Sequence, residues 1–129
     1  MKGSNRPKLV PVSEEMKAWS SALKAEMAEW PQVTARSSFG LTALYRNEQI
    51  FALLPRTRGM ETPNSLAFRL DSPSPAMRVR LAKDRRIGSA HMQKARWFTF
   101  EMSSDADLHN ALGWLGRAYE VACKAQKSS

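Results

Sequence analysis

The sequence predicts an α+β fold in two layers, with a mostly antiparallel sheet of about five strands and helices on one face. Two observations support this prediction. Amphipathic helical patterns occupy both ends of the 129-residue chain, and short strand-like runs separated by turn residues fill the middle. A further short helical pattern between the strands gives the order α-β-β-β-α-β-β-α. The length fits one domain, which we place at 13–124, between a flexible arm at 1–12 and a frayed tail at 125–129.

The first helix is predicted at 13–29. Ser13 is a favourable N-cap, and glutamates follow it in the first turn, where negative charge suits the helix dipole. Apolar residues then recur every three or four positions and predict one buried stripe: Met16, Trp19, Leu23, Met27 and Trp30. Pro31 follows this stripe and ends the helix.

The patterns in the middle of the chain are typical of strands. Residues 41–45 and 50–54 are apolar runs joined by a short polar segment, which predicts a hairpin. Gly40 precedes the first run and supplies a backbone conformation that other residues resist. Residues 65–70 alternate as in a half-buried strand. Residues 33–38 are weakly apolar and fit either an edge strand or a plain connection.

Beyond a proline-containing break, the sequence predicts one more helix and two more strands. A short helix is expected at 76–83, where Met77 and Leu81 face inward. A weak strand is expected at 87–92. Residues 96–102 are rich in aromatic residues and predict the last strand.

The chain then enters its second long helical pattern. Ser103 or Ser104 is expected to cap this helix, with aspartates in its first turn. Its predicted buried stripe is Leu108, Leu112, Leu115, Tyr119 and Ala122. Gly113 and Gly116 weaken the helix and are expected to mark close packing on the sheet.

Composition places the chain among globular proteins of a reducing compartment. It is 43% hydrophobic and 25% charged, and its single cysteine, Cys123, excludes an intramolecular disulfide and a Cys-rich zinc site. No run approaches the roughly 20 apolar residues that span a bilayer, and the N-terminus has no secretion-signal pattern. We therefore expect a cytoplasmic protein without a membrane partner.

Positive charge is concentrated in the middle of the chain. Lysine and arginine total 20 against 12 acids, and residues 31–100 account for the whole net charge of +8. Seven basic residues opposed only by Asp84 fall within 19 positions: Arg78, Arg80, Lys83, Arg85, Arg86, Lys94 and Arg96. Guanidinium groups suit phosphate oxygens, so this segment predicts contact with DNA or RNA. The alternative is a solvated basic surface that keeps the protein soluble.

One aromatic residue beside the basic segment is a candidate for base stacking. Trp97 and Phe98 are neighbours on a predicted strand, so their side chains point to opposite faces. If Trp97 points outward, it lies near Arg96 and would stack on a base. The alternative is that Trp97 packs under a helix.

The sequence contains no recognisable catalytic or metal-binding pattern. Its two histidines, His91 and His109, have no partner at a spacing typical of metal or nucleophilic sites. Phosphate-cradling glycine motifs are also absent from the sequence. We therefore expect a binding protein without cofactor or metal, and not an enzyme.

Three stretches of the chain resemble the MmcQ/YjbR-like proteins and, more distantly, the N-terminal domain of TfoX. Residues 91–97 resemble the family run His-Met-x-Lys-x-x-Trp, carried here by His91, Met92, Lys94 and Trp97. The hairpin that begins at Phe39-Gly40 and the end of the last helix, at 118–122, are also similar. The resemblance implies a CyaY-like α+β domain. At the level of fold it also implies a double-wing protein that binds DNA.

Two other functions remain open. An interaction module would hold a protein or peptide on an open sheet face or along an edge strand. A small-ligand binder would have a pocket between the sheet and the loop at 56–64. Nucleic-acid binding predicts a contiguous positive surface, the interaction module predicts an exposed apolar patch, and the ligand binder predicts an enclosed cavity.

Overall fold

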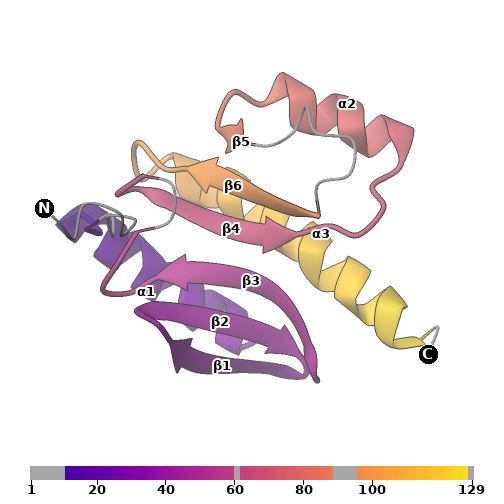
Figure 1. The fold of residues 1–129 in the computed structure, drawn as a ribbon, viewed down its shortest axis with the longest axis horizontal. Coiled ribbons are helices and arrows are strands. Elements are labelled where there is room, and N and C mark those ends of the chain that lie inside the picture. Colours follow the sequence, from indigo (N-terminus) through magenta and orange to yellow (C-terminus); the bar gives the residue numbers. More distant parts are fainter. Residues whose placement is uncertain (1–10, 60–61, 89–95, 128–129) are drawn as a thin grey trace, which may run out of the picture.

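The computed structural model describes residues 11–59, 62–88 and 96–127. The helices and strands within these residues, in chain order, are α1 (Glu14–Ala28), β1 (Val33–Ser38), β2 (Leu41–Arg46), β3 (Gln49–Pro55), β4 (Ser65–Arg69), α2 (Pro75–Lys83), β5 (Ile87–Gly88), β6 (Trp97–Glu101) and α3 (Asp107–Lys127). The predicted α+β class and the antiparallel sheet are confirmed (Figure 1). Most of the predicted arm, at 1–10, and the last two residues of the predicted tail lie outside the described residues.

The strands form one sheet in the order β1-β2-β3-β4-β6-β5, with antiparallel neighbours throughout. The sheet has six strands in the described residues, one more than predicted, because β1 pairs with β2 along its whole length. The side chains of β1 after Val33 are exposed, so β1 lacks the apolar alternation by which strands are recognised. Beyond Gly88, the strand predicted at 87–92 lies outside the described residues.

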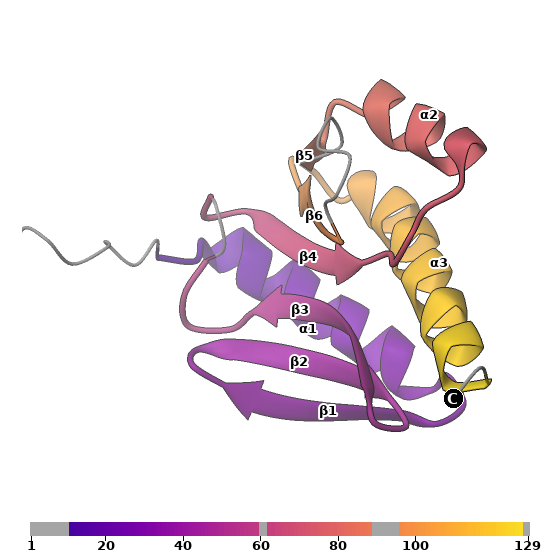
Figure 2. The ribbon, with the colours of Figure 1, turned by 45° about the vertical axis from the view of Figure 1, so that its right-hand side comes forward.

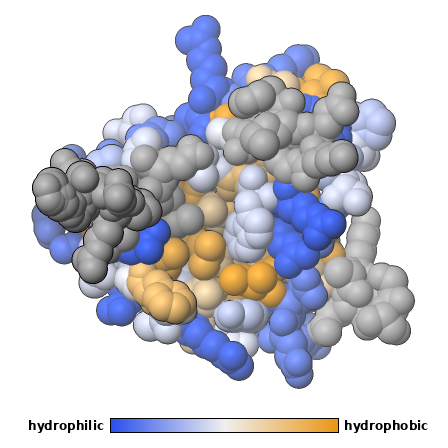
Figure 3. Space-filling view, in the orientation of Figure 1, coloured by the Kyte–Doolittle hydropathy of each residue, from blue (hydrophilic) through white to orange (hydrophobic). Residues whose placement is uncertain are grey.

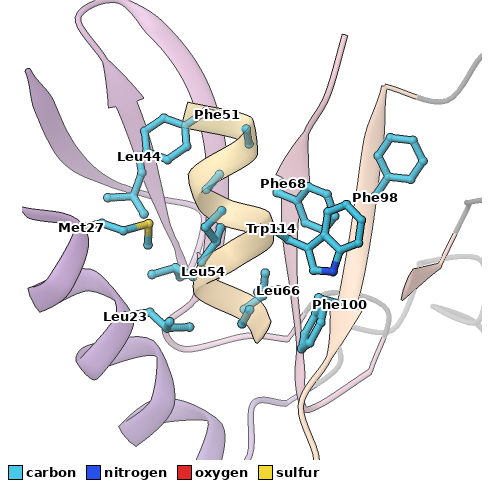
Figure 4. Close-up of a cluster of buried hydrophobic side chains, with 14 of the residues drawn as sticks. Leu23, Met27, Leu44, Phe51, Leu54, Leu66, Phe68, Phe98, Phe100 and Trp114 are labelled. Carbon is cyan, nitrogen blue, oxygen red and sulfur yellow. The ribbon is translucent and has the colours of Figure 1, made fainter. Parts of the chain in front are cut away.

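Helices α1 and α3 cover one face of the sheet, and α2 lies apart, at the edge formed by β5 (Figures 1 and 2). The core between helices and sheet is largely aromatic, with Phe51, Phe68, Phe98 and Phe100 fully buried. Trp114 of α3 lies beside Phe68 in Figure 4, and their ring centroids are 5.8 Å apart in a stacked arrangement. Each such buried side chain stabilises the fold by about 1.5–3 kcal/mol relative to exposure, and together they hold α1 and α3 on the sheet.

Helix α1 begins where the sequence predicts. The Ser13 hydroxyl accepts a hydrogen bond from the Met16 N–H at 3.0 Å and donates one to the side chain of Asn64. The backbone N–H of Ser13 donates to the Pro63 carbonyl at 3.2 Å, and Val12 is buried. Residues 11 and 12 of the predicted arm are therefore docked against the loop that precedes β4.

Helix α3 begins at Asp107, later than the serines that the sequence predicts as its cap. The Asp107 carboxylate accepts hydrogen bonds from the backbone N–H groups of Ser103, at 2.8 Å, and Ser104, at 3.2 Å. These contacts fold the chain into a turn before the helix starts. A side chain of the first helical residue thus replaces the predicted serine cap.

Candidate functional site

An open groove of about 800 Å³ lies between α2 and α3. Its lining residues are Arg80, Lys83, Asp84, Arg85, Arg86, His109, Asn110, Gly113, Trp114 and Arg117. Half of them are lysine or arginine, and one is acidic. The groove therefore concentrates positive charge from two segments that are distant in the sequence.

The α2 side of the groove supplies three exposed cations. Arg80 and Lys83 lie in the last turn of α2, and Arg85 follows it. Ser74 caps the helix by accepting the Met77 N–H at 3.1 Å, and Leu81 is its one fully buried side chain. Because Leu81 fixes which side of α2 faces the core, Arg80 and Lys83 project into solvent.

The α3 side of the groove includes a row of residues four positions apart, His109, Gly113 and Arg117, with Asn110 and Trp114 beside it. A Cβ added at position 113 would meet nothing within 4 Å, so the middle of the row is open. The prediction that Gly113 marks close packing is therefore wrong. At Gly116 an added Cβ would meet Trp30 at 3.9 Å, which is ordinary contact and not close packing.

Arg86 also lines the groove, but its guanidinium is engaged by two carboxylates. Its Nε donates to Asp84 Oδ1 at 3.0 Å, and its Nη1 donates to Asp107 Oδ1 at 2.6 Å. The guanidinium carbon also lies 5.1 Å from the centroid of the Phe100 ring. Two carboxylates outweigh one guanidinium, so Arg86 joins the end of α2 to the start of α3 and adds no net positive charge.

Arg86, Asp84 and Asp107 form what we call the Arg86 cluster. The shifts in their pKa values all favour the charged form. Burial alone would raise the pKa of Asp84, but hydrogen bonds from the side chain and backbone of Arg86 and from Trp114 lower it below the ordinary 3.8. The pKa of Asp107 is also lowered. Burial alone would raise it, but hydrogen bonds from the backbone of Ser103, the side chain of Arg86 and the backbone of Ser104 lower it. The hydrogen bond to Asp84 is the main cause that raises the pKa of Arg86.

Trp114 forms part of the wall of the groove and anchors Asp84. The indole Nε1–H donates to Asp84 Oδ2 at 3.2 Å, while the ring is 8% exposed and packs on Phe68. The guanidinium of Arg117 lies 5.5 Å from the centroid of the Trp114 ring. The tryptophan therefore positions charged groups and presents little ring surface to a ligand.

The structure brings together part of the predicted basic segment. Arg80, Lys83, Arg85 and Arg86 line the groove, whereas Arg78, half-buried on α2, is not among its lining residues. Arg96 is exposed just before β6. The predicted residues His91, Met92 and Lys94 lie outside the described residues.

Trp97 lies on the open sheet face, away from the groove. It is half-buried and pairs with Arg69 across β4 and β6, while Phe98 is fully buried on the helix side. The prediction that the two side chains point to opposite faces is confirmed. Trp97 and the α2 cations therefore belong to different surfaces.

Sequence reasoning missed the contribution of α3. His109, Asn110 and Arg117 line the groove, although all three lie outside the basic segment that the sequence singles out at 78–96. The sequence pattern that could have identified this side of the groove is the row of non-apolar positions 109, 113 and 117, which are four apart and lie opposite the buried stripe of the helix. Pairing that row with α2 requires the fold.

The groove has no sign of a metal centre or a membrane segment. In the described part of the chain, no three His, Cys, Asp or Glu side chains converge as a metal site requires. Among the same residues, no helix has the length and apolarity needed to cross a bilayer.

Comparison with protein-family models, curated proteins and solved structures gives no match in any of the three.

Proposed function

We propose that this chain is a nucleic-acid-binding domain that holds backbone phosphates in the groove between α2 and α3. The observation that carries the proposal is the convergence of Arg80, Lys83, Arg85 and Arg117 on one open groove, where none of them has a carboxylate partner among the ion pairs of the described residues. Guanidinium forks bind phosphate oxygens in a bidentate manner, and such contacts release counterions from nucleic acid.

The groove favours phosphates over bases. Its one tryptophan, Trp114, is buried against Phe68 and is not available for stacking, and the only other ring among the described residues of its lining is the imidazole of His109. Contacts to phosphates position a nucleic acid without reading its sequence. The groove by itself therefore supports binding with strong salt dependence and weak sequence preference.

The broader identity that fits this proposal is a cytoplasmic MmcQ/YjbR-like domain that acts by binding and carries out no reaction. The resemblance to that family of residues 91–97, of the hairpin that begins at Phe39-Gly40 and of the helix at 118–122 supports the assignment, and so does the CyaY-like expectation of helices on one face of an antiparallel sheet. The single cysteine supports a reducing compartment.

Charge reversal in the groove tests the proposal. The variant combines Arg80→Glu with Arg85→Glu, because both side chains are exposed and neither is part of the Arg86 cluster. Fluorescence anisotropy measures binding to labelled single-stranded DNA, duplex DNA and RNA at two salt concentrations. We expect the variant to bind at least about tenfold more weakly at low salt and to show a salt slope less steep by roughly 1–2.

The matched control reverses two exposed cations on α1 by combining Lys17→Glu with Lys24→Glu. It changes the net charge of the protein by the same amount but leaves the groove intact. Equal losses in both double variants would show that only net charge matters and would contradict the groove assignment. Wild-type protein that binds none of the nucleic acids at low salt would overturn the proposed function.

A second candidate function is supported by the open sheet face. Figure 3 shows apolar side chains gathered over the middle of this face, where Leu41, Ile50 and Leu53 are half-buried. The outer side of β1 is a sheet edge to which an extended peptide could add a strand. Binding of a protein or peptide there would be unaffected by the Arg80→Glu and Arg85→Glu changes and lost with Leu53→Asp.

A further inference from the structure

The turn between β1 and β2 presents a phenylalanine to solvent. The strands pair Ser38 with Leu41, so Phe39 and Gly40 form a two-residue turn. Phe39 is 87% exposed, the highest exposure of any large apolar side chain in the described residues. Its φ of 51° lies in the left-handed region, where bulky side chains are rare.

Comparison with the neighbouring hairpin indicates that Phe39 is not the residue that would stabilise the turn best. Asn47 occupies the same first turn position between β2 and β3, with a φ of 56°. Asparagine is a favoured residue for that conformation, because its short side chain tolerates it. Phe39 therefore adds both backbone strain and exposed apolar surface that an asparagine would avoid.

The turn is held rigidly against the following loop. The Gly40 carbonyl accepts hydrogen bonds from the backbone N–H groups of Arg56 at 3.0 Å, Thr57 at 2.9 Å and Arg58 at 3.3 Å. An added Cβ at Gly40 would approach Thr57 Oγ1 and Arg58 Cγ at 2.7 Å. The backbone that carries the phenyl ring is therefore fixed, and little backbone freedom remains to be lost when the ring binds a partner.

The charged residues in the chain segments that adjoin the turn are all basic. The segments 34–45 and 55–59 contain Arg36, Arg56 and Arg58 and no aspartate or glutamate. Arg56 is exposed and its backbone N–H is bonded to the turn, whereas the Arg36 guanidinium packs on the Tyr45 ring of the same hairpin, 5.2 Å from its centroid. An exposed aromatic ring with basic residues in the adjoining segments suits a nucleotide, since the ring would stack on the base while a neighbouring arginine binds the backbone.

We infer that Phe39 stacks on an unpaired base, so that the preferred ligand is single-stranded nucleic acid; this inference rests on the proposed function. A single projecting ring presents far less surface than the roughly 800 Å² per partner of a typical protein interface. Bases in a duplex are already stacked on each other, so an external ring gains contact only with an unpaired base.

Figures 1 and 2 place the β1–β2 turn and α2 at opposite ends of the molecule. The turn and the groove therefore contact different nucleotides of one strand. The groove contributes charge, and the turn contributes stacking. Removal of one should leave the other in place.

The experiment compares Phe39→Asn with Phe39→Trp. Phe39→Asn removes the ring and installs the residue that the turn favours, so we expect it to raise the Tm, which excludes misfolding as a cause of lost binding. Phe39→Trp keeps an aromatic ring. The probes are an oligothymidine of about 20 nucleotides, the same length of abasic backbone, and duplex DNA, all measured by anisotropy.

We expect Phe39→Asn to weaken oligothymidine binding roughly 5- to 100-fold, and Phe39→Trp to retain it. Both variants should bind the abasic backbone and the duplex as the wild type does. Unchanged oligothymidine affinity in Phe39→Asn, with the wild type still binding and the groove variant still weakened, would overturn this inference and leave the proposed function standing.

Two further outcomes are decisive. A wild type that binds none of the three probes overturns the proposed function, and this inference falls with it. Vesicles containing phosphatidylglycerol test a lipid surface as the partner. Binding to them that depends on Phe39, together with oligothymidine binding that does not, would show that the ring inserts into a membrane and would overturn base stacking.

Discussion

The α2–α3 groove and the β1–β2 turn lie at opposite ends of the molecule and are constructed in opposite ways. The groove collects cations from two segments, and its framework is the Arg86 cluster with Asp84 and Asp107. The turn depends on one side chain, Phe39, held in a strained conformation by its neighbour Gly40. The groove is therefore a property of the tertiary fold, whereas the turn is a property of a few consecutive residues.

The two surfaces therefore differ in which substitutions they tolerate. Exposed cations of the groove can be changed one at a time with little effect on folding, because solvent already surrounds them. The framework beneath them cannot, because its charges are half-buried and bonded to one another. At the turn, the residue that binds is also the residue that strains the backbone.

The free energy of unfolding should change most when Arg86, which joins Asp84 and Asp107 beneath the groove, is replaced. We expect Arg86→Ala to lower the free energy of unfolding by about 2–3 kcal/mol, because it leaves two partly buried carboxylates without their partner. Arg85→Ala, one residue earlier and exposed, should change it by less than about 0.5 kcal/mol. Urea denaturation measures both. Equal effects at the two positions would contradict the division between framework and binding arginines.

Acid should weaken the same framework. The pKa values of Asp84 and Asp107 lie below 3.8 in the folded protein, so both carboxylates stabilise the fold above that pH and lose this contribution as pH falls through their folded pKa values. Asp107→Asn should therefore be less stable than the wild type near pH 7, by a margin that shrinks as the pH falls from about 5 to about 2. Urea denaturation across this range measures the margin. A constant margin would show that Asp107 does not act through its charge.

The smallest effects are expected at Gly113, in the row formed by His109, Gly113 and Arg117 on α3. Gly113→Ala should raise the free energy of unfolding by about 1 kcal/mol, because alanine favours a helix and its Cβ meets open space. Gly113→Glu should keep part of this gain and yet weaken nucleic-acid binding by about tenfold, since it places a negative charge among the cations.

The control for this pair is Gly116→Ala, which faces Trp30 and not the groove. It should alter stability without altering binding. Thermal unfolding and anisotropy on the same samples separate the two effects. Binding that follows stability across all three variants would contradict a role for position 113 in the groove.

Much of the fold could be predicted because its buried residues are periodic. The stripe of α1 and the hairpin of β2 and β3 are visible in the sequence. The structure buries four of the five residues of the predicted stripe, leaving Trp30 half-buried beyond the helix, and it pairs the two predicted strands of the hairpin. The sequence does not decide strand β1, because the strand is recognised by its pairing with β2 and its own side chains after Val33 stay in solvent. The start of α3 shifted because Asp107 captures backbone N–H groups that precede it.

The candidate site could be predicted only in part. The density of arginine near residue 80 indicated a basic surface, but the sequence does not distinguish Arg85, which faces solvent, from Arg86, which binds Asp107 from a position 21 residues away. The contribution of Arg117 appears only when α3 packs beside α2. The exposed ring of Phe39 could not be inferred either, since its exposure follows from the turn that Gly40 forms.

The contacts between the two ends of the chain have a consequence for how this protein folds. The indole of Trp19 donates to Asp105 over a separation of 86 residues, and the Tyr119 hydroxyl donates to the Pro31 carbonyl over 88. Helix α1 therefore packs fully only after α3 has been synthesised. Contacts of such high sequence separation slow folding, because a long loop must close before they form. On the ribosome, the β1–β3 meander would emerge with only α1 available to cover its apolar face, until the last helix is synthesised.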